Sequence, residues 1–232
     1  MKLRILSLLV IIVVCFHTFR AWESSDRHLR YTVYKLFADS GSCTGVKVFA
    51  PSGKAYVLTA GHCASLLKDG TVKATTEDGV EYTLNFIEED PYSDLLLLSA
   101  PVDGPAVSVA KQLERHEHVH TLTHGRGYPT YRTDGEAVAT DVTTVPTLRL
   151  TNPNDIVKCS SPKYTIITTP FGDRACAVVT VQLISTASLI PGSSGGPLFN
   201  AEGQLAGIAS ATDDKFAAFV TLSDIGSFLK GR

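Results

Sequence analysis

Short runs of apolar residues separated by turn residues dominate the chain from about residue 44 onwards. In the first half these runs include TGVKVFA (44–50), AYVLTA (55–60) and DLLLLSA (94–100), with turns such as PSG between them. The second half continues in the same style with TLRLTN, YTIITTP, CAVVTVQLIS, QLAGIASA and KFAAFV. Many short apolar runs at close spacing are typical of an all-β barrel or sandwich.

A polar stretch near residues 101–115 divides these runs into two β halves of similar size. We therefore place an N-terminal β domain at residues 34–112 and a C-terminal β domain at residues 113–232. Only residues 221–230 have a helical pattern. They begin with a threonine and an aspartate at the spacing of a helix cap, and their later apolar residues share one face.

The first 22 residues differ from the rest of the chain. Lys2 and Arg4 precede an unbroken apolar run, LLVIIVVCF, at residues 8–16. This run is short for a membrane span, which needs about 20 residues, and it suits the apolar region of a secretory signal. Its cleavage pattern is poor, so residues 1–22 are either a signal peptide or a membrane anchor. Both alternatives predict an exported or membrane-anchored protein, joined by a polar linker at residues 23–33.

If the protein is exported, its cysteines lie in an oxidising compartment. Apart from Cys15, the chain has Cys43, Cys63, Cys159 and Cys176. An even number of cysteines in an oxidising compartment predicts disulfides, with three possible connectivities. We expect the pairs closest in sequence, Cys43–Cys63 and Cys159–Cys176. Four free thiols are the alternative, and the absence of a C-x-x-C pair argues against a metal site.

Composition and net charge bear on the core and on the expected partners. The 232 residues are 44% hydrophobic, which is enough for a packed core, and the formal net charge is −2. A chain with this charge has no general attraction for a polyanion, so nucleic acid is not expected as a partner.

A histidine-rich tract, HEHVHTLTH at residues 116–124, is the candidate metal site. His116, His118 and His120 would share one face of a strand, and imidazoles bind Zn²⁺. No carboxylate or thiol is evidently placed to complete a closed site. An exposed histidine-rich strand is therefore the favoured interpretation, and we expect neither a metal nor another cofactor.

Three segments carry the residue types of nucleophilic catalysis. A serine nucleophile needs a general base, usually histidine, an aspartate that orients the base, and N–H donors for the oxyanion. His62 follows the run YVLTAG, Asp94 opens the run DLLLL, and Ser194 lies among small residues in PGSSGG. A carboxylate that leads into an apolar strand is costly unless it has a partner such as an imidazole. Asp90 is the nearby alternative to Asp94.

TAGHC, SDLLLL and PGSSGGPL, in this order, resemble the three catalytic segments of chymotrypsin-like serine proteases. GSCTG and the closing KFAAFVTLSDIGSFL resemble the high-temperature-requirement branch of that family. The resemblance covers roughly residues 40–230 and concerns the protease domain alone. It implies two six-stranded antiparallel β-barrels with a short C-terminal helix. It also implies a serine endopeptidase that acts on polypeptides, with Ser194 as nucleophile, His62 as general base and Asp94 as its orienter.

The same resemblance implies a finer site. The backbone N–H groups of Gly192 and Ser194 would form the oxyanion hole. Ser188 would form the floor of the first specificity pocket, where an uncharged residue fits a small or medium apolar side chain before the scissile bond. The strand expected to pair with an extended substrate by β-augmentation comprises Gly207, Ile208 and Ala209.

One departure from the family pattern bears on activation. Chymotrypsin carries an aspartate just before its nucleophile, which receives a freed N-terminal ammonium after zymogen cleavage. This chain has Ser193 there and no start resembling I-V-G-G, so that form of activation is not expected. Two other classes stay open: a catalytically inactive binding protein with a protease fold, and a histidine-rich metal-binding exported protein. The intact set of three argues against the first, because one replacement would suffice to abolish turnover.

Overall fold

Strands dominate the chain and form two closed six-stranded barrels, which confirms the predicted all-β, two-barrel class. The computed structural model describes residues 27–90, 92–127, 130–144, 147–149, 164–168, 174–178, 180–212 and 215–232. The predicted signal peptide or anchor lies outside these ranges. Among the residues that the structure describes, no helix is long and apolar enough to cross a membrane.

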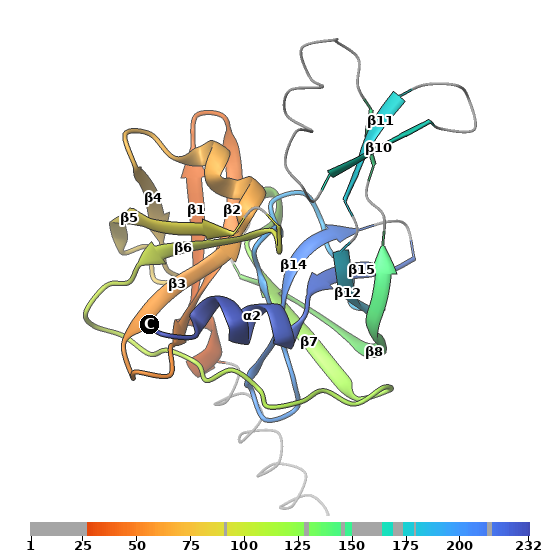
Figure 1. Ribbon diagram of the computed structural model, residues 1–232. Coiled ribbons are helices and arrows are strands. Elements are labelled where there is room, and N and C mark those ends of the chain that lie inside the picture. Colours follow the sequence, from red (N-terminus) through yellow and green to blue (C-terminus); the bar gives the residue numbers. More distant parts are fainter. Residues whose placement is uncertain are drawn as a thin grey trace, which may run out of the picture.

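Around the wall of the first barrel the strands lie in the order β1-β2-β3-β6-β5-β4, and β4 pairs with β1 to close the barrel. All neighbouring strands are antiparallel. Its strands are β1 (Val33–Ala38), β2 (Gly41–Phe49), β3 (Ala55–Ala60), β4 (Thr71–Thr75), β5 (Glu81–Asp90) and β6 (Leu95–Ser99). In Figure 1 this barrel is the orange-to-yellow half of the molecule.

The run of four leucines in β6 is buried along its whole length because the strand has a core on each face. Leu96 and Leu98 point into the first barrel. Leu95 and Leu97 belong to a second cluster that includes Phe199 of the other barrel. Alternate residues of a strand face opposite sides, so a continuous apolar run indicates burial on both. This packing fixes the strand that begins directly after Asp94.

The second barrel has the order β12-β15-β14-β13-β7-β8 and closes through the pairing of β8 with β12. Its strands are β7 (His118–Thr123), β8 (Tyr131–Thr144), β12 (Thr180–Ser185), β13 (Pro197–Phe199), β14 (Leu205–Thr212) and β15 (Ala217–Val220). A separate sheet of β9 (Thr147–Arg149), β10 (Tyr164–Thr168) and β11 (Arg174–Val178) joins this half. Figure 1 shows β10 and β11 projecting beyond the second barrel.

The predicted C-terminal helix is present as α2 (Leu222–Leu229), and the Thr221 side chain caps it by accepting a hydrogen bond from the Asp224 N–H. Its buried residues Ile225 and Leu229 join the cluster shared by both barrels. The helix therefore helps to hold the two barrels in a fixed relation, and Figure 1 shows it lying across them.

Two segments outside the strands also help to hold the two barrels in position relative to each other. Residues 27–30 form a helical turn in which Leu29 is buried, so the described part of the predicted polar linker packs against the core. The buried Lys47 of β2 donates its Nζ hydrogens to three carbonyl oxygens of the connection between the barrels, at 2.7 to 3.1 Å. Burial lowers the pKa of this lysine, while Asp103 opposes the shift. These hydrogen bonds compensate for the free-energy cost of burying the Lys47 ammonium group.

Candidate active site

His62 lies where the first barrel turns from a strand into a helix. β3 ends at Ala60, and His62 is the second residue of the 3₁₀ helix η1 (Gly61–Leu66). A Cβ on Gly61 would lie 3.0 Å from the Asp94 carbonyl carbon, so glycine allows these two backbones to approach.

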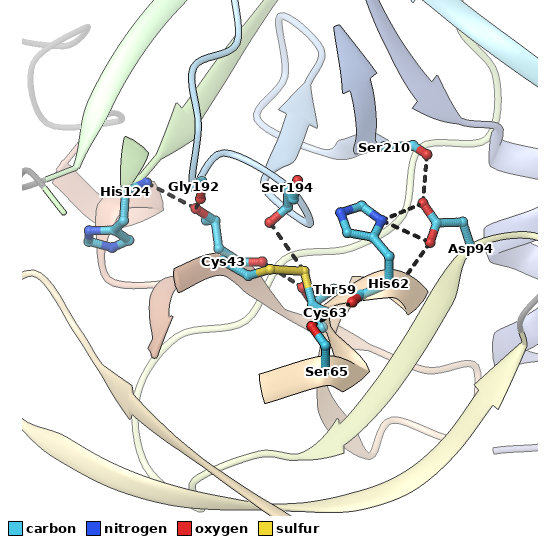
Figure 2. The surroundings of a disulfide bond; sticks show 11 residues. Cys43, Thr59, His62, Cys63, Ser65, Asp94, His124, Gly192, Ser194 and Ser210 are labelled. Carbon is cyan, nitrogen blue, oxygen red and sulfur yellow. Dashed lines mark hydrogen bonds and ion pairs between the residues drawn. A yellow bond between two sulfur atoms is a disulfide. The ribbon is translucent and has the colours of Figure 1, made fainter. Parts of the chain in front are cut away.

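A disulfide ties η1 to β2 beside this histidine. Cys43 and Cys63 form the bond, as the sequence predicted. Cys159 and the side chain of Cys176 lie outside what the structure describes, so that second pair stays a prediction. The Cys43–Cys63 bond anchors the residue next to His62, and Figure 2 shows how close the two lie.

Asp94 ends the turn that leads into β6, and its backbone has φ of 55°, a left-handed conformation that aspartate adopts more readily than most residues. The carboxylate of Asp90 accepts hydrogen bonds from Tyr92 N and Ser93 Oγ, both at 2.9 Å. Asp90 therefore stabilises the turn that presents Asp94. The alternative in which Asp90 orients the histidine is wrong.

Asp94 holds His62 by both backbone and side chain. His62 Nδ1 lies 3.1 Å from Oδ1 and 3.0 Å from Oδ2, and the His62 N–H donates to Oδ1 at 2.8 Å. Ser210 Oγ donates to Oδ2 at 2.6 Å. Nothing in the sequence singles out Ser210, because only the fold brings β14 next to the Asp94 turn. Figure 2 shows the imidazole between Ser194 and Asp94.

These contacts shift both titrations in favour of the ion pair. The hydrogen bond to Asp94 raises the pKa of His62 above 6.5, with burial acting in the opposite direction and the charge of Asp94 adding to the rise. Burial raises the pKa of Asp94, but the hydrogen bonds and charge of His62 and the Ser210 hydroxyl outweigh it, so the net pKa is lowered. An ionised Asp94 requires the proton on Nδ1, which leaves the Nε2 lone pair free to accept one.

Ser194 follows a tight turn at residues 190–193. The Ser193 N–H donates to the Ile190 carbonyl at 2.9 Å, and Gly192 has φ of 93°. Proline at the second position and a glycine with positive φ at the third define a type II turn. The Pro191 carbonyl accepts from Arg126 N at 2.6 Å. Because the peptide is planar and trans, the Gly192 N–H points away from Arg126.

Two N–H groups of this segment have no hydrogen-bond partner among the described residues, namely those of Gly192 and Ser194. The intervening Ser193 N–H and the following Gly195 and Gly196 N–H groups are all paired with carbonyls. A pair of unpaired donors beside a serine hydroxyl is the arrangement that stabilises an oxyanion.

The Ser194 side chain makes no hydrogen bond with the His62 ring in the part of the chain that the structure describes. Such contacts are often long without substrate and tighten when it binds. The Ser194 carbonyl accepts from Thr44 N at 2.8 Å, so the Ser194 segment of the second barrel is tied to β2 of the first. His62 and Asp94 come from the first barrel and Ser194 from the second.

The open edge of β14 lies further along the strand than the sequence predicted. Both edges of the segment containing Gly207, Ile208 and Ala209 are occupied, because β13 pairs on one side and β15 on the other. Ala209 also exchanges two backbone hydrogen bonds with Gly195 and Gly196. Beyond Ala209 the described strand pairing is with β15. The edge open to a peptide therefore begins at Ser210, three residues later than predicted.

Ser188, the predicted floor of the specificity pocket, is exposed, and its carbonyl accepts from Thr133 Oγ1 at 2.8 Å. Its hydroxyl is uncharged, as the prediction of an apolar preference requires. The role in substrate selection stays a prediction.

The predicted common face holds for His118 and His120 of β7, which both lie toward Asp134 of β8, whereas His116 lies outside the strand. His116 precedes β7 with φ of 67°, His118 is exposed, and His120 is buried against the Phe199 ring. The interpretation of an exposed strand is wrong, because only the first residue of β7 is exposed. Among the described residues, no group of three histidine, cysteine, aspartate or glutamate side chains could hold a metal ion.

Comparisons with known proteins agree with this geometry. Residues 43–208 match the family model described as the trypsin-like peptidase domain. The curated Serine protease Do-like HtrA of Bacillus subtilis (strain 168) is 27% identical over 177 residues, which cover 74% of this chain and 34% of that protein. The chain therefore spans about a third of the length of this relative.

Solved structures show the same fold at low sequence identity. The active form of the Rv3671c protease from M. tuberculosis has a TM-score of 0.66 and 17% identity, with 88% of this chain and 81% of that chain covered. The serine endoprotease from Yersinia pestis has a TM-score of 0.62 and 17% identity, with 91% and 68% covered. At this identity the likeness concerns the fold alone.

Proposed function

The chain belongs to the trypsin-like peptidase family, and we propose that it hydrolyses peptide bonds through a Ser194–His62–Asp94 triad. Ser194 Oγ attacks the scissile carbonyl while His62 Nε2 accepts its proton. Asp94 holds the imidazole in the required tautomer and stabilises the imidazolium that forms. His62 then returns the proton to the leaving amine, and water hydrolyses the acyl-enzyme by the same steps in reverse order.

The oxyanion of each tetrahedral intermediate would be bound by the N–H groups of Gly192 and Ser194. Both donors are unpaired among the described residues and belong to a turn whose neighbouring amides are paired. Donors held in place before the reaction need no reorganisation when negative charge develops.

The pairing of His62 with Asp94 is the observation that carries this proposal. The carboxylate binds both the backbone N–H and Nδ1 of the same histidine, at 2.8 and 3.0–3.1 Å. A histidine held only for structural reasons needs neither a half-buried carboxylate on Nδ1 nor a second ring nitrogen directed to the serine side, which Figure 2 shows. Sites with mutually shifted pKa values are enriched in catalysis.

The substrate would be an extended polypeptide added by β-augmentation to the edge of β14 that begins at Ser210. The uncharged Ser188 at the predicted pocket offers no partner for lysine or arginine, so we propose a small or medium apolar residue before the scissile bond. We also propose that the protein is exported. The Cys43–Cys63 disulfide supports this location, since such bonds persist mainly in oxidising compartments.

Digestion of an unfolded protein tests the proposal. Fluorescein-labelled casein is incubated with residues 24–232 of the wild type and with the Ser194→Ala variant, and the new ends are identified by mass spectrometry. We expect cleavage by the wild type alone, after small or medium apolar residues. Equal cleavage by both would trace the activity to a contaminant. A folded wild type that cleaves nothing would favour an inactive binding protein.

A further inference from the structure

The turn that carries Gly192 has to be held in one of two states. Types I and II differ by rotation of the central peptide, here the one between Pro191 and Gly192. Glycine tolerates both states, because it has no Cβ to oppose either backbone conformation. In the observed state the Gly192 N–H is unpaired, and rotation of the peptide would carry this donor to the opposite side. The Arg126 N–H holds the carbonyl of this peptide at 2.6 Å, and the residues on either side must keep the turn in place for that contact to persist.

A threonine of the first barrel fixes one end of the turn. Thr44 is fully buried, and its Oγ1 accepts a hydrogen bond from His124 N at 3.0 Å. Its single hydroxyl hydrogen is then directed to the Gly192 carbonyl at 2.9 Å. The Thr44 N–H donates to the Ser194 carbonyl at 2.8 Å. One residue of β2 thus binds the carbonyl groups on both sides of Ser193.

A second threonine fixes the other end of the turn. Thr123 Oγ1 of β7 lies 2.9 Å from Ser193 Oγ, which is itself buried, with 1% exposure. Ser193 Oγ also accepts from the Ile190 N–H at 3.2 Å. The position just before the nucleophile is therefore held by hydroxyl groups and carries no ionised side chain.

We propose that Thr44 and Thr123 are positioning residues that lock the turn in the state that leaves the Gly192 N–H free for the oxyanion. This inference rests on the proposed function and explains how the oxyanion hole reaches its active state. A neutral network within the fold sets the oxyanion hole, and no freed N-terminus is needed to form it. Both threonines act through the turn and contact no reacting atom.

The network has the properties that such a lock requires. Its three hydroxyls are buried, and each has a partner among Gly192, His124, Ile190 and one another. A buried hydroxyl that loses its partner is costly, so rotation of the turn is opposed on both barrels. Because Thr44 and Thr123 come from different barrels, the lock also depends on the two barrels being docked.

Labelling kinetics with a fluorophosphonate test the lock. The probe phosphonylates an activated serine with loss of fluoride. Its phosphonyl oxygen then lies in the oxyanion hole. Residues 24–232 of the wild type, Thr44→Val, Thr44→Ser and Thr123→Val are compared without any proteolytic processing. Thr32→Val is the matched control, since the fully buried Thr32 hydroxyl also donates to a carbonyl, that of Leu29 at 2.7 Å, away from the turn.

We expect Thr44→Val to lower the second-order labelling rate constant about 100-fold, the effect typical of losing one oxyanion donor. Thr123→Val should lower it about 10-fold, a smaller loss because it removes one neutral hydrogen bond of the turn. Thr44→Ser keeps the hydroxyl and should restore the rate. The pH midpoint of labelling should stay that of the wild type, because His62 and Asp94 are untouched.

Two other results would count against the inference. If Thr44→Val and Thr123→Val label as fast as Thr32→Val, the lock is wrong while the proposed function stands. If the folded wild type does not label at all, both the proposed function and a preformed hole are wrong. Thermal unfolding of each variant separates slow labelling from loss of the fold. Should Thr44→Val fail to fold, Thr123→Val carries the test alone.

Discussion

Ser210 donates a hydrogen bond of 2.6 Å from its Oγ to Oδ2 of Asp94, across the boundary between the two barrels. Asp94 belongs to the turn before β6 in the first barrel, and Ser210 belongs to β14 in the second. In the proposed function the same β14 residue begins the edge that takes the peptide. The orientation of the histidine and the position of the substrate would then be linked through one side chain.

Replacement of Ser210 by alanine should lower kcat/KM about 10-fold, since a hydrogen bond to a charged group contributes about 1.5–3 kcal/mol. The carboxylate of Asp94 would lose one of its donors and hold the imidazole less firmly. Steady-state cleavage of a peptide substrate measures the effect. Ser99→Ala is the control, because that hydroxyl accepts from Asn85 N within the first barrel. Equal kinetics for the two variants would contradict the link.

The pH dependence of kcat/KM should report the raised pKa of His62. Catalysis needs the neutral imidazole, and Asp94 stabilises the protonated one, so activity should rise with a midpoint above pH 6.5. The Asp94→Asn variant should move this midpoint down and lower kcat by about 10⁴. His116→Gln should leave the profile unchanged, because that histidine is exposed outside the site. A wild-type midpoint at or below 6.5 would be inconsistent with the pairing.

Loss of the Cys43–Cys63 bond should destabilise the first barrel. The bond closes a loop with a sequence separation of 20 residues, for which the chain-entropy model gives about 3 kcal/mol. Denaturant unfolding of the Cys43→Ala/Cys63→Ala double variant measures the change in the free energy of unfolding. Activity should fall as well, because Cys63 adjoins His62. A loss under about 1 kcal/mol would show that the bond contributes little to the stability.

Gly195 should be far less tolerant of alanine than another glycine with the same backbone. Gly195 and Gly53 have φ of 78° and 83°. A Cβ on Gly53 would meet nothing within 4 Å, whereas one on Gly195 would lie 2.7 Å from Ala60 N and would also overlap Thr44 and Thr59. We expect about 1 kcal/mol of destabilisation for Gly53→Ala and at least about 3 kcal/mol for Gly195→Ala, since overpacking adds to the backbone cost. Thermal unfolding compares them.

Sequence reasoning found the residues that local patterns mark. His62, Asp94 and Ser194 each lie at a junction between an apolar run and a turn, and those junctions could be read from the order of residues. The Pro-Gly turn and the helix cap at Thr221 are local in the same sense. The two-barrel topology followed from these signals together with the family resemblance, and the Cys43–Cys63 pair followed from joining the cysteines closest in sequence.

The contacts that support the site depend on residues far apart in the chain. Thr44, Thr123 and Ser210 are ordinary strand residues in the sequence, and only the docking of two barrels brings their hydroxyls to the site. The error over Gly207, Ile208 and Ala209 has the same origin, because strand pairing decides which edge is open. The burial of the histidine tract does not follow from its composition, because β7 begins at His118 and buries its next residues.

The proposed triad requires that Ser194 is an activated nucleophile in the folded protein. Residues 24–232 are treated with a fluorophosphonate, and mass spectrometry locates the adduct. Heat-denatured protein, Ser194→Ala and His62→Ala serve as controls. We predict one adduct, on Ser194 of the folded wild type, with its rate greatly reduced in His62→Ala. No adduct on a folded protein, or equal labelling without His62, would contradict the proposed triad.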